Sequence, residues 1–386
     1  MSTRRKANLN NPALLTWARE TAGYSIEEIA VTFGKPPEVI AAWERGDDCP
    51  TFSQLERFAR KVKRSLAALY LPQPPSDAPL PADFRRLPSS RGGEFGPVAR
   101  LAFRTLRNAV SDLADLLEET RTPISFDLPE VHIRQPAAVG AAILREALGV
   151  SMDQQIAWSS DYAALDGWRD ILFDRGILVR LLSVDTAEFR GFSVLERHLA
   201  GIGISSKDAP PARIFSLFHE VAHLCLRLPG VSGDSIDIPD AASDHLAVVE
   251  RYCNCFAVAF LLPDGDGKVA KALADLSASS LAPQMLRHYS RAFKVSKYVL
   301  ARRMLDIGLL QPDMYWNTID EWRNQEVSLP KGGHPDYMTA HVSQIGKRFA
   351  AFVLSAMDRG ILNGHDAAGI LAMRPDKLDA VRLHLA

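Results

Sequence analysis

Two histidines and a glutamate stand at a spacing that suits metal chemistry. His219, Glu220 and His223 form an H-E-x-x-H pattern. On a helix the two histidines lie one turn apart on the same face, where both imidazoles can bind one metal ion. The glutamate projects beside the metal and can take a proton from a bound water. The pattern therefore predicts zinc-dependent hydrolysis of a peptide bond. The alternative is a pair of buried, hydrogen-bonded histidines on a core helix.

A catalytic zinc site needs a third protein ligand, and Glu250 is the candidate. It stands near the start of an apolar, helix-length run, residues 248–263, and a buried carboxylate needs a partner. Asn254 follows one turn later on the same face and can orient an imidazole. The alternative is that Glu250 is exposed in a first helical turn, where its charge suits the helix dipole. His245 and Tyr252 are candidate donors to a substrate oxygen, and the sequence does not decide between them.

The elements that must position these groups are two helices and a small sheet. Apolar residues recur at steps of three and four along residues 212–228, and a Pro-Gly pair then ends the helix. Three strand-like runs come just before it, at residues 177–184, 188–195 and 199–206. We therefore expect a small antiparallel sheet that packs on the H-E-x-x-H helix.

The first seventy residues predict a separate helical unit. Residues 10–72 read as five short helices, and the capping boxes Ser25–Glu28 and Ser53–Glu56 start two of them. A tight turn at residues 34–36 joins the second and third helices, as in a helix-turn-helix. Residues 1–75 hold 11 Lys and Arg against 8 Asp and Glu, so their electrostatic attraction to DNA is modest.

The helix order and the ending Trp43-Glu44-Arg45-Gly46 resemble the Xre/Cro-type helix-turn-helix family. The resemblance implies that the third helix, residues 37–45, enters the major groove, with Lys35, Glu38 and Arg45 towards double-stranded DNA. This helix lacks the Asn and Gln side chains that commonly read bases. The alternative is a helical module that docks a protein partner.

The two chemical motifs together resemble the ImmA/IrrE family of metallopeptidases. The match lies in FSLFHEVAHL (residues 215–224) and ERYCNCFAVAFLLP (residues 250–263). In that family an H-E-x-x-H helix is followed by E-x-x-A-N-x-F-A-x-x-x-L-x-P. The resemblance implies that Glu250 supplies the third ligand of Zn2+. The chain departs from the family at Cys253, where Ala is usual, and at Phe218, which is often Ala.

The resemblance also implies a function and a substrate. It indicates a zinc-dependent endopeptidase that cleaves a helix-turn-helix transcriptional repressor and so switches on gene expression, under stress or in a mobile element. It places residues 189–193 in the sheet, where an exposed strand edge would bind an extended substrate. The N-terminal module would bring the peptidase to the DNA that its target occupies. The alternative function is a DNA-binding regulator or antitoxin whose peptidase fold is structural or sensory.

Composition excludes several other classes. The chain has 386 residues, of which 47% are apolar, as expected for two or three globular domains. A net charge of -1 gives no chain-wide attraction to nucleic acid or membrane. The sequence contains no run of 18 apolar residues, so we expect no membrane span, and the N-terminus does not read as a secretory signal. Four cysteines indicate free thiols, so we expect a cytoplasmic protein.

We therefore expect a mostly helical α+β chain in four parts. These are a helix-turn-helix domain at 1–72, a Pro-rich linker at 73–97, a zincin-like peptidase domain at 98–265 and a helical region at 266–386. Residues 288–310 resemble a second helix-turn-helix pair, but a helical lobe that covers the peptidase is the preferred interpretation. The sequence predicts no oligomeric state.

Overall fold

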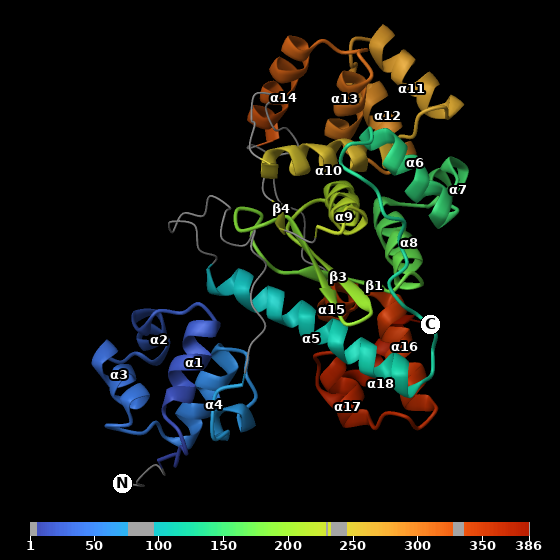
Figure 1. The fold of residues 1–386 in the computed structure, drawn as a ribbon. Coiled ribbons are helices and arrows are strands. Elements are labelled where there is room, and N and C mark those ends of the chain that lie inside the picture. The colour runs from blue at the N-terminus through green and yellow to red at the C-terminus, as the bar shows by residue number, and fades with distance from the viewer. Residues whose placement is uncertain (1–5, 76–95, 229–230, 233–244, 327–335, 386) are drawn as a thin grey trace. The chain divides into compact units, whose positions relative to one another are not determined.

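The computed structural model describes residues 6–75, 96–228, 231–232, 245–326 and 336–385 (Figure 1). The chain divides into two compact units, Met1–Thr105 and Leu106–Ala386. Helix α5 (Pro97–Glu119) has residues in both. Most of the predicted linker lies outside the described residues, and the predicted boundaries at 72, 97 and 265 stay predictions.

The first unit is a bundle of short helices around one apolar core. Ile29 of the second helix, Ile40 and Trp43 of the third, and Phe58 of the fourth are all buried in it. The fifth helix is a single 3-10 turn, so the five predicted helices are present. They are α1 (Ala13–Thr21), α2 (Ile26–Phe33), α3 (Pro37–Arg45), α4 (Phe52–Lys61) and η1 (Ala67–Tyr70).

Capping residues set the ends of these helices. The predicted capping box of Ser25 and Glu28 starts α2. Helix α4 starts earlier than predicted, because the hydroxyl of Thr51 accepts from the Gln54 N–H and that amide side chain accepts from the Thr51 N–H. Gly34 then forms the tight turn between α2 and α3 in the left-handed region, with φ of 60°.

The second unit contains a mixed sheet. In the described residues its strands are β1 (Ile177–Leu182), β2 (Gly191–Glu196), β3 (Leu199–Ser205) and β4 (Val231–Ser232), in the order β1-β3-β2-β4. Strand β2 is antiparallel to β3 and β4, as predicted, but β1 is parallel to β3. The expectation of a wholly antiparallel sheet is corrected here, because β3 forms a hairpin with β2 and inserts between β2 and β1.

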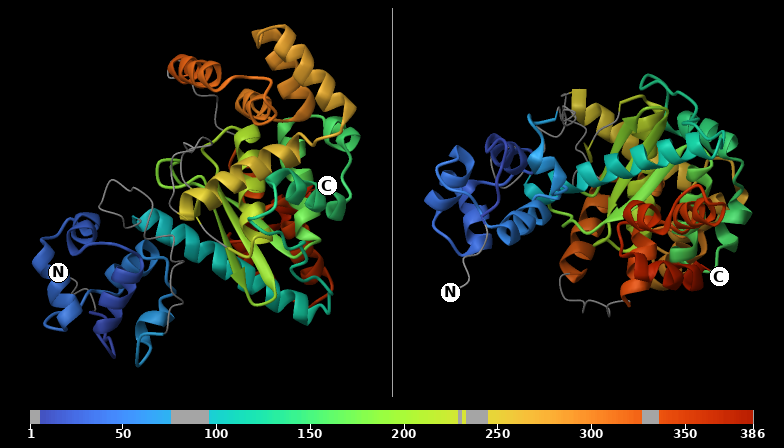
Figure 2. Two further views of the ribbon diagram at one scale, coloured as in Figure 1. Left: turned by 45° about the horizontal axis from the view of Figure 1, so that its top comes forward. Right: turned by 90° about the horizontal axis from the view of Figure 1, so that it is seen from below.

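Helices cover both faces of this sheet (Figures 1 and 2). Ile202 and Ile204 of β3 lie in the same core as the H-E-x-x-H helix, α9 (Pro210–Cys225). Gly201 points to the other face, where α5 passes so closely that a Cβ would lie 2.6 Å from a methyl of Val110. Helix α8 (Asp161–Phe173) packs against β1.

The core behind the sheet is aromatic. The ring centroid of Trp168 lies 4.8 Å from that of Phe218 on α9, and Phe218 stacks at 4.0 Å on Phe260 of α10 (His245–Leu261). Helix α10 also packs along α6 (Ala137–Leu148), beside the short α7 (Met152–Ala157). These contacts hold α9 and α10 side by side, which positions the two predicted ligand helices.

Two further groups of helices flank this core (Figure 1). The first contacts α10 through α13 and comprises α11 (Gly267–Ala278), α12 (Pro283–Phe293), α13 (Lys297–Asp306) and α14 (Pro312–Glu326). The second contacts β1 and α8 and comprises α15 (Tyr337–Ile345), α16 (Lys347–Asp358), α17 (Gly364–Ile370), η3 (Pro375–Lys377) and α18 (Leu378–Leu385).

The resemblance of residues 288–310 to a second helix-turn-helix reflects packing. All six residues from Val299 to Met304 of α13 are buried, including Arg302 and Arg303. A helix that is buried on every side cannot enter a DNA groove, so the preferred interpretation as a packing lobe fits. In the part of the chain that the structure describes, no helix has the length and apolar character to cross a bilayer.

Candidate metal centre

The H-E-x-x-H residues lie on the buried part of α9. Helix α9 starts with Pro210 and Pro211, which fit its first turn because that turn needs no intrahelical N–H donors. His219, Glu220 and His223 are 3%, 0% and 2% exposed. The Nε2 atoms of His219 and His223 lie 3.1 Å apart. The helix therefore presents both rings to one point inside the second unit.

Glu250 reaches the same point from α10. Its Oε2 lies 3.2 Å from Nε2 of His219, and its Oε1 lies 3.1 Å from Nε2 of His223. Burial alone would raise the pKa of Glu250, but hydrogen bonds from the two imidazoles outweigh it and hold that pKa well below its usual range. The carboxylate, whose side chain is 16% exposed, is thus a largely enclosed anion aimed between two histidines, and not the exposed first-turn residue of the alternative.

These three side chains fit a zinc ion. In a tetrahedral site with nitrogen and oxygen ligands, neighbouring ligand atoms are about 3.3 Å apart. The separations of 3.1 and 3.2 Å among the two imidazole nitrogens and the carboxylate oxygens agree with that edge length. The chemistry of the set, two imidazoles and one carboxylate, is also that of catalytic zinc sites.

Hydrogen bonds on the far side of each ring fix the orientation of both histidines. Nδ1 of His219 lies 2.8 Å from Oδ1 of Asn254, and Nδ1 of His223 lies 3.1 Å from the carbonyl oxygen of Leu228. Both partners are acceptors, so each Nδ1 carries the proton and donates it. Without a metal, each Nε2 can hold a second proton and donate it to Glu250; a metal ion would take the place of those protons and bind the Nε2 lone pairs.

Glu220 lies against the start of strand β2. A Cβ built on Gly191 would be 2.9 Å from Oε1 of Glu220 and 3.0 Å from its Cγ. Only a glycine at this position leaves the carboxylate its place. Gly191 and Phe192 also pair with β4, so the predicted substrate-binding edge at residues 189–193 is already occupied at those two residues.

Cys253 is a site residue that the sequence reasoning missed. Its side chain is fully buried, and its Sγ lies within 4.8 Å of one nitrogen of both His219 and His223. Burial raises the pKa of this thiol. Two trios thus share the histidine pair, one completed by Glu250 and one by Cys253. The carboxylate contacts match the tetrahedral edge, so Glu250 is the better third ligand.

Of the two candidate oxygen donors, Tyr252 is not brought into the site. Tyr252 turns towards α6, where its hydroxyl oxygen would lie 2.7 Å from a Cβ on Gly140. The side chain of His245 lies outside the described residues. The residues on either side of Cys253 therefore face different helices: Asn254 faces α9, and Tyr252 faces α6.

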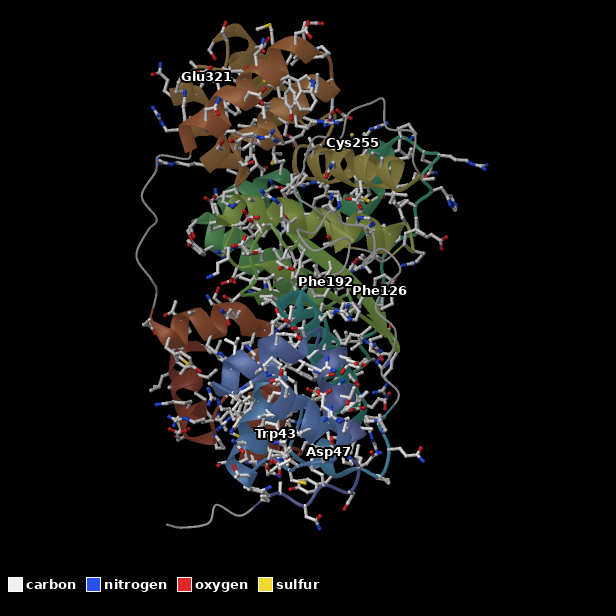
Figure 3. All side chains as sticks on the ribbon, turned by 90° about the vertical axis from the view of Figure 1, so that its left-hand side faces the viewer. Trp43, Asp47, Phe126, Phe192, Cys255 and Glu321 are labelled. Carbon is white, nitrogen blue, oxygen red and sulfur yellow. The ribbon has the colours of Figure 1, made fainter. Side chains whose placement is uncertain are left out.

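The predicted DNA-facing residues lie on the surface of the first unit. Glu38 and Arg45 of α3 are exposed, and Lys35 is partly exposed in the turn before it. The guanidinium of Arg45 pairs with Asp47 at 2.8 Å. Glu44 is not available to DNA, because it forms a buried ion pair with Arg19 of α1 at 2.7 Å. Trp43 and Asp47, which flank Glu44 and Arg45 in the sequence, are labelled in Figure 3.

Comparison with known families agrees with both sets of motifs. Residues 174–305 match an IrrE N-terminal-like domain, which is a peptidase family, and this range contains the sheet, α9 and α10. Residues 15–69 match a helix-turn-helix family. No curated protein and no solved structure was found to match the chain. The chain thus contains an IrrE N-terminal-like domain of the peptidase type and, nearer its N-terminus, a helix-turn-helix domain.

Proposed function

We propose that this protein is a zinc-dependent endopeptidase. Nε2 of His219, Nε2 of His223 and the carboxylate of Glu250 would hold the ion, and Asn254 keeps His219 in the required tautomer. A bound zinc ion supplies a Lewis acid that makes water nucleophilic near neutral pH and stabilises negative charge on a carbonyl oxygen. The observation that carries the proposal is the convergence of these side chains within 3.2 Å from two separate helices.

Glu220 is the proposed catalytic base. It accepts the proton of the attacking water and then delivers a proton to the leaving amine. Its complete burial beside Gly191 keeps the carboxylate in one place, so little reorganisation is needed when the proton moves. The other protein groups of the site bind and orient, and only Glu220 transfers a proton in this scheme.

The proposed substrate is a helix-turn-helix repressor in the cytoplasm, whose cleavage switches on gene expression. The support is the N-terminal domain of the chain, which is of the DNA-binding helix-turn-helix type. This domain would bring the peptidase to DNA that the repressor occupies. Lys35, Glu38 and Arg45 are its proposed DNA-facing residues, although the Arg45–Asp47 pair reduces the positive charge there. We therefore expect weak, salt-sensitive DNA binding.

Metal analysis and two glutamate variants test the enzyme. The purified chain should carry about one zinc per molecule. Glu250→Ala should lose most of this zinc. Glu220→Gln should keep the zinc but lose at least about a hundredfold in the rate at which the chain cleaves repressors encoded next to its gene. Glu146→Gln, an exposed change on α6, should match the unmodified chain.

Two results would contradict the proposal. One is a chain that binds no zinc, and the other is a Glu220→Gln variant that cleaves at the normal rate. A chelator should stop cleavage by the unmodified chain. If the chain binds DNA but neither holds zinc nor cleaves any neighbouring repressor, it is instead a DNA-binding regulator or antitoxin whose peptidase fold is structural or sensory.

A further inference from the structure

We infer that the thiolate of Cys253 is a fourth protein ligand, which closes the metal site in the resting chain. The inference rests on the proposed zinc site and extends it. It gives this chain a donor set of two imidazoles, one carboxylate and one thiolate. The consequence is a latent peptidase, in which cleavage requires Cys253 to leave the metal.

The position of Cys253 on α10 carries the inference. Glu250, Cys253 and Asn254 stand at i, i+3 and i+4, so they share the face of α10 that meets α9. The two neighbours of Cys253 on this face already contact the histidines, at 3.1 and 3.2 Å for Glu250 and at 2.8 Å for Asn254. Cys253 lies between them in the sequence, and its Sγ lies within 4.8 Å of both imidazoles.

The thiol of Cys253 is enclosed beside the two histidines and is not a surface group. Cys253 is 0% exposed, and the histidines beside it are 3% and 2% exposed. A thiol held at this position would lie beside any metal ion that the two histidines bind. Thiolate is a strong ligand of zinc, and on binding the thiol releases its proton to solvent.

Four protein ligands change what the site can do. Zinc sites with four protein ligands are closed and structural, whereas catalytic sites keep one position for water. With Cys253 bound, Glu220 has no water to deprotonate. A soft sulfur ligand also favours zinc over manganese, which prefers oxygen donors. The same residue therefore sets both the resting activity and the choice of metal.

The other thiols of the second unit serve as controls. Cys255, labelled in Figure 3, is on the same helix. Its Sγ lies 3.4 Å from a guanidinium nitrogen of Arg302 on α13. Cys225 is buried near the end of α9, two residues after His223. Within the described residues, Cys253 forms a group of three metal-binding side chains with His219 and His223, and neither Cys255 nor Cys225 belongs to it. Cys255→Ser is thus a matched control.

Cobalt replacement tests the inference independently of activity. The chain is loaded with Co2+, and its absorption is recorded for the unmodified protein, Cys253→Ala, Cys253→Ser and Cys255→Ser. A thiolate ligand gives an intense charge-transfer band in the near ultraviolet. We expect this band in the unmodified chain and in Cys255→Ser, and its loss in both Cys253 variants. The Cys253 variants should also bind Co2+ at least about tenfold more weakly.

The outcomes separate this inference from the proposed function. If the unmodified chain binds one Co2+ without the charge-transfer band, the thiolate ligand is excluded while the histidine and glutamate site stands. If it binds no Co2+ at all, the proposed function fails together with the inference. Circular dichroism would check that each variant is folded. A Cys253→Ala variant that lost the band but cleaved no faster than the unmodified chain would overturn the closed resting state.

Discussion

In the proposed metal site, Asn254 would decide which nitrogen of His219 binds the metal. Its Oδ1 accepts from Nδ1 at 2.8 Å inside a fully packed core. Without that acceptor, the proton could move to Nε2, and the ring could rotate away from Glu250. His223 depends less on a side chain, because the carbonyl of Leu228 serves it. A side-chain substitution can therefore remove the hydrogen-bond acceptor of His219 but not that of His223.

Replacing Asn254 should weaken metal binding without unfolding the chain. Asn254→Ala removes the acceptor of Nδ1, and the loss of such a partner typically lowers metal affinity about 10- to 100-fold. Competition with a zinc-binding dye would measure this change. Asn254→Asp keeps an acceptor in the same position and should restore most of the affinity. Equal affinities for the alanine variant and the unmodified chain would show that packing alone orients His219.

A methyl group on Gly191 should act on Glu220 rather than on the metal. The added Cβ would lie 2.9 Å from Oε1 of Glu220, so the carboxylate must move. We expect Gly191→Ala to keep its zinc and to lose cleavage by about tenfold or more, because a small misplacement of a catalytic group has a large effect on rate. Gly267→Ala has open space around it and should be silent. Zinc loss in Gly191→Ala would contradict this account.

Helical periodicity explains what could be predicted at the site. The spacing of His219 and His223, and of Glu250 and Asn254, follows from one turn of a helix, and the two helices then pack along their apolar faces. The proximity of Gly191 to Glu220 depends on where a distant strand begins, which no local pattern encodes. Cys253 had a signal in its i+3 spacing from Glu250, but its apolar surroundings made it read as a core residue.

At the scale of elements, α3 is tied to its own domain more firmly than its sequence suggests. Glu44 is one of the few polar residues on this helix, and its side chain is 7% exposed. Both of its oxygens accept from the guanidinium of Arg19, at 2.7 and 2.9 Å. The pair fixes the angle between α1 and α3, so Glu44 holds the helix in place instead of reading DNA.

Removing one member of this pair should loosen the first unit. Glu44→Ala removes the closer and less exposed carboxylate partner of the buried Arg19 and leaves it Glu20 at 3.3 Å, so the cost should reach at most the roughly 3 kcal/mol of a fully broken buried pair. Hydrogen exchange of the full chain should therefore speed up across α1 and α3. Glu38→Ala, on the same helix but exposed, is the control and should leave exchange unchanged. Similar protection in both variants would argue that the ion pair contributes nothing.

The strands show the limit of local patterns at this scale. Their positions were predictable within a few residues, because the apolar runs are bounded by polar and glycine residues. Their order was not, since β1 and β2 are neighbours in the chain but not in the sheet. The two-residue turn at Arg197 and His198, with φ of 55° at Arg197, closes the β2–β3 hairpin and leaves β1 to pair in parallel.

At the scale of the whole molecule, the C-terminal helices belong to the second unit as much as the peptidase core does. Arg169 of α8 is buried and joins them. It donates to the carbonyl oxygen of Val179 on β1 at 2.9 Å, and to those of Ser343 and Gln344 near the end of α15 at 2.7 and 3.3 Å. One side chain thus connects a helix, the sheet and the C-terminal group.

Replacing Arg169 should detach the C-terminal helices from the sheet. Arg169→Met fills similar space but leaves the carbonyl groups of Val179 and Ser343 without their donor, at about 1–3 kcal/mol for each buried group. Limited proteolysis should then cut between α15 and α18 faster than in the unmodified chain. Arg348→Met removes an exposed pair with Asp174 and should change little, since such pairs contribute at most about 1 kcal/mol.

Because β1 also pairs with β3, a loosened β1 should disturb the face of the sheet that supports α9. Arg169→Met should therefore lower zinc retention as well, and full retention after cleavage of the C-terminal helices would show that the metal site stands without them.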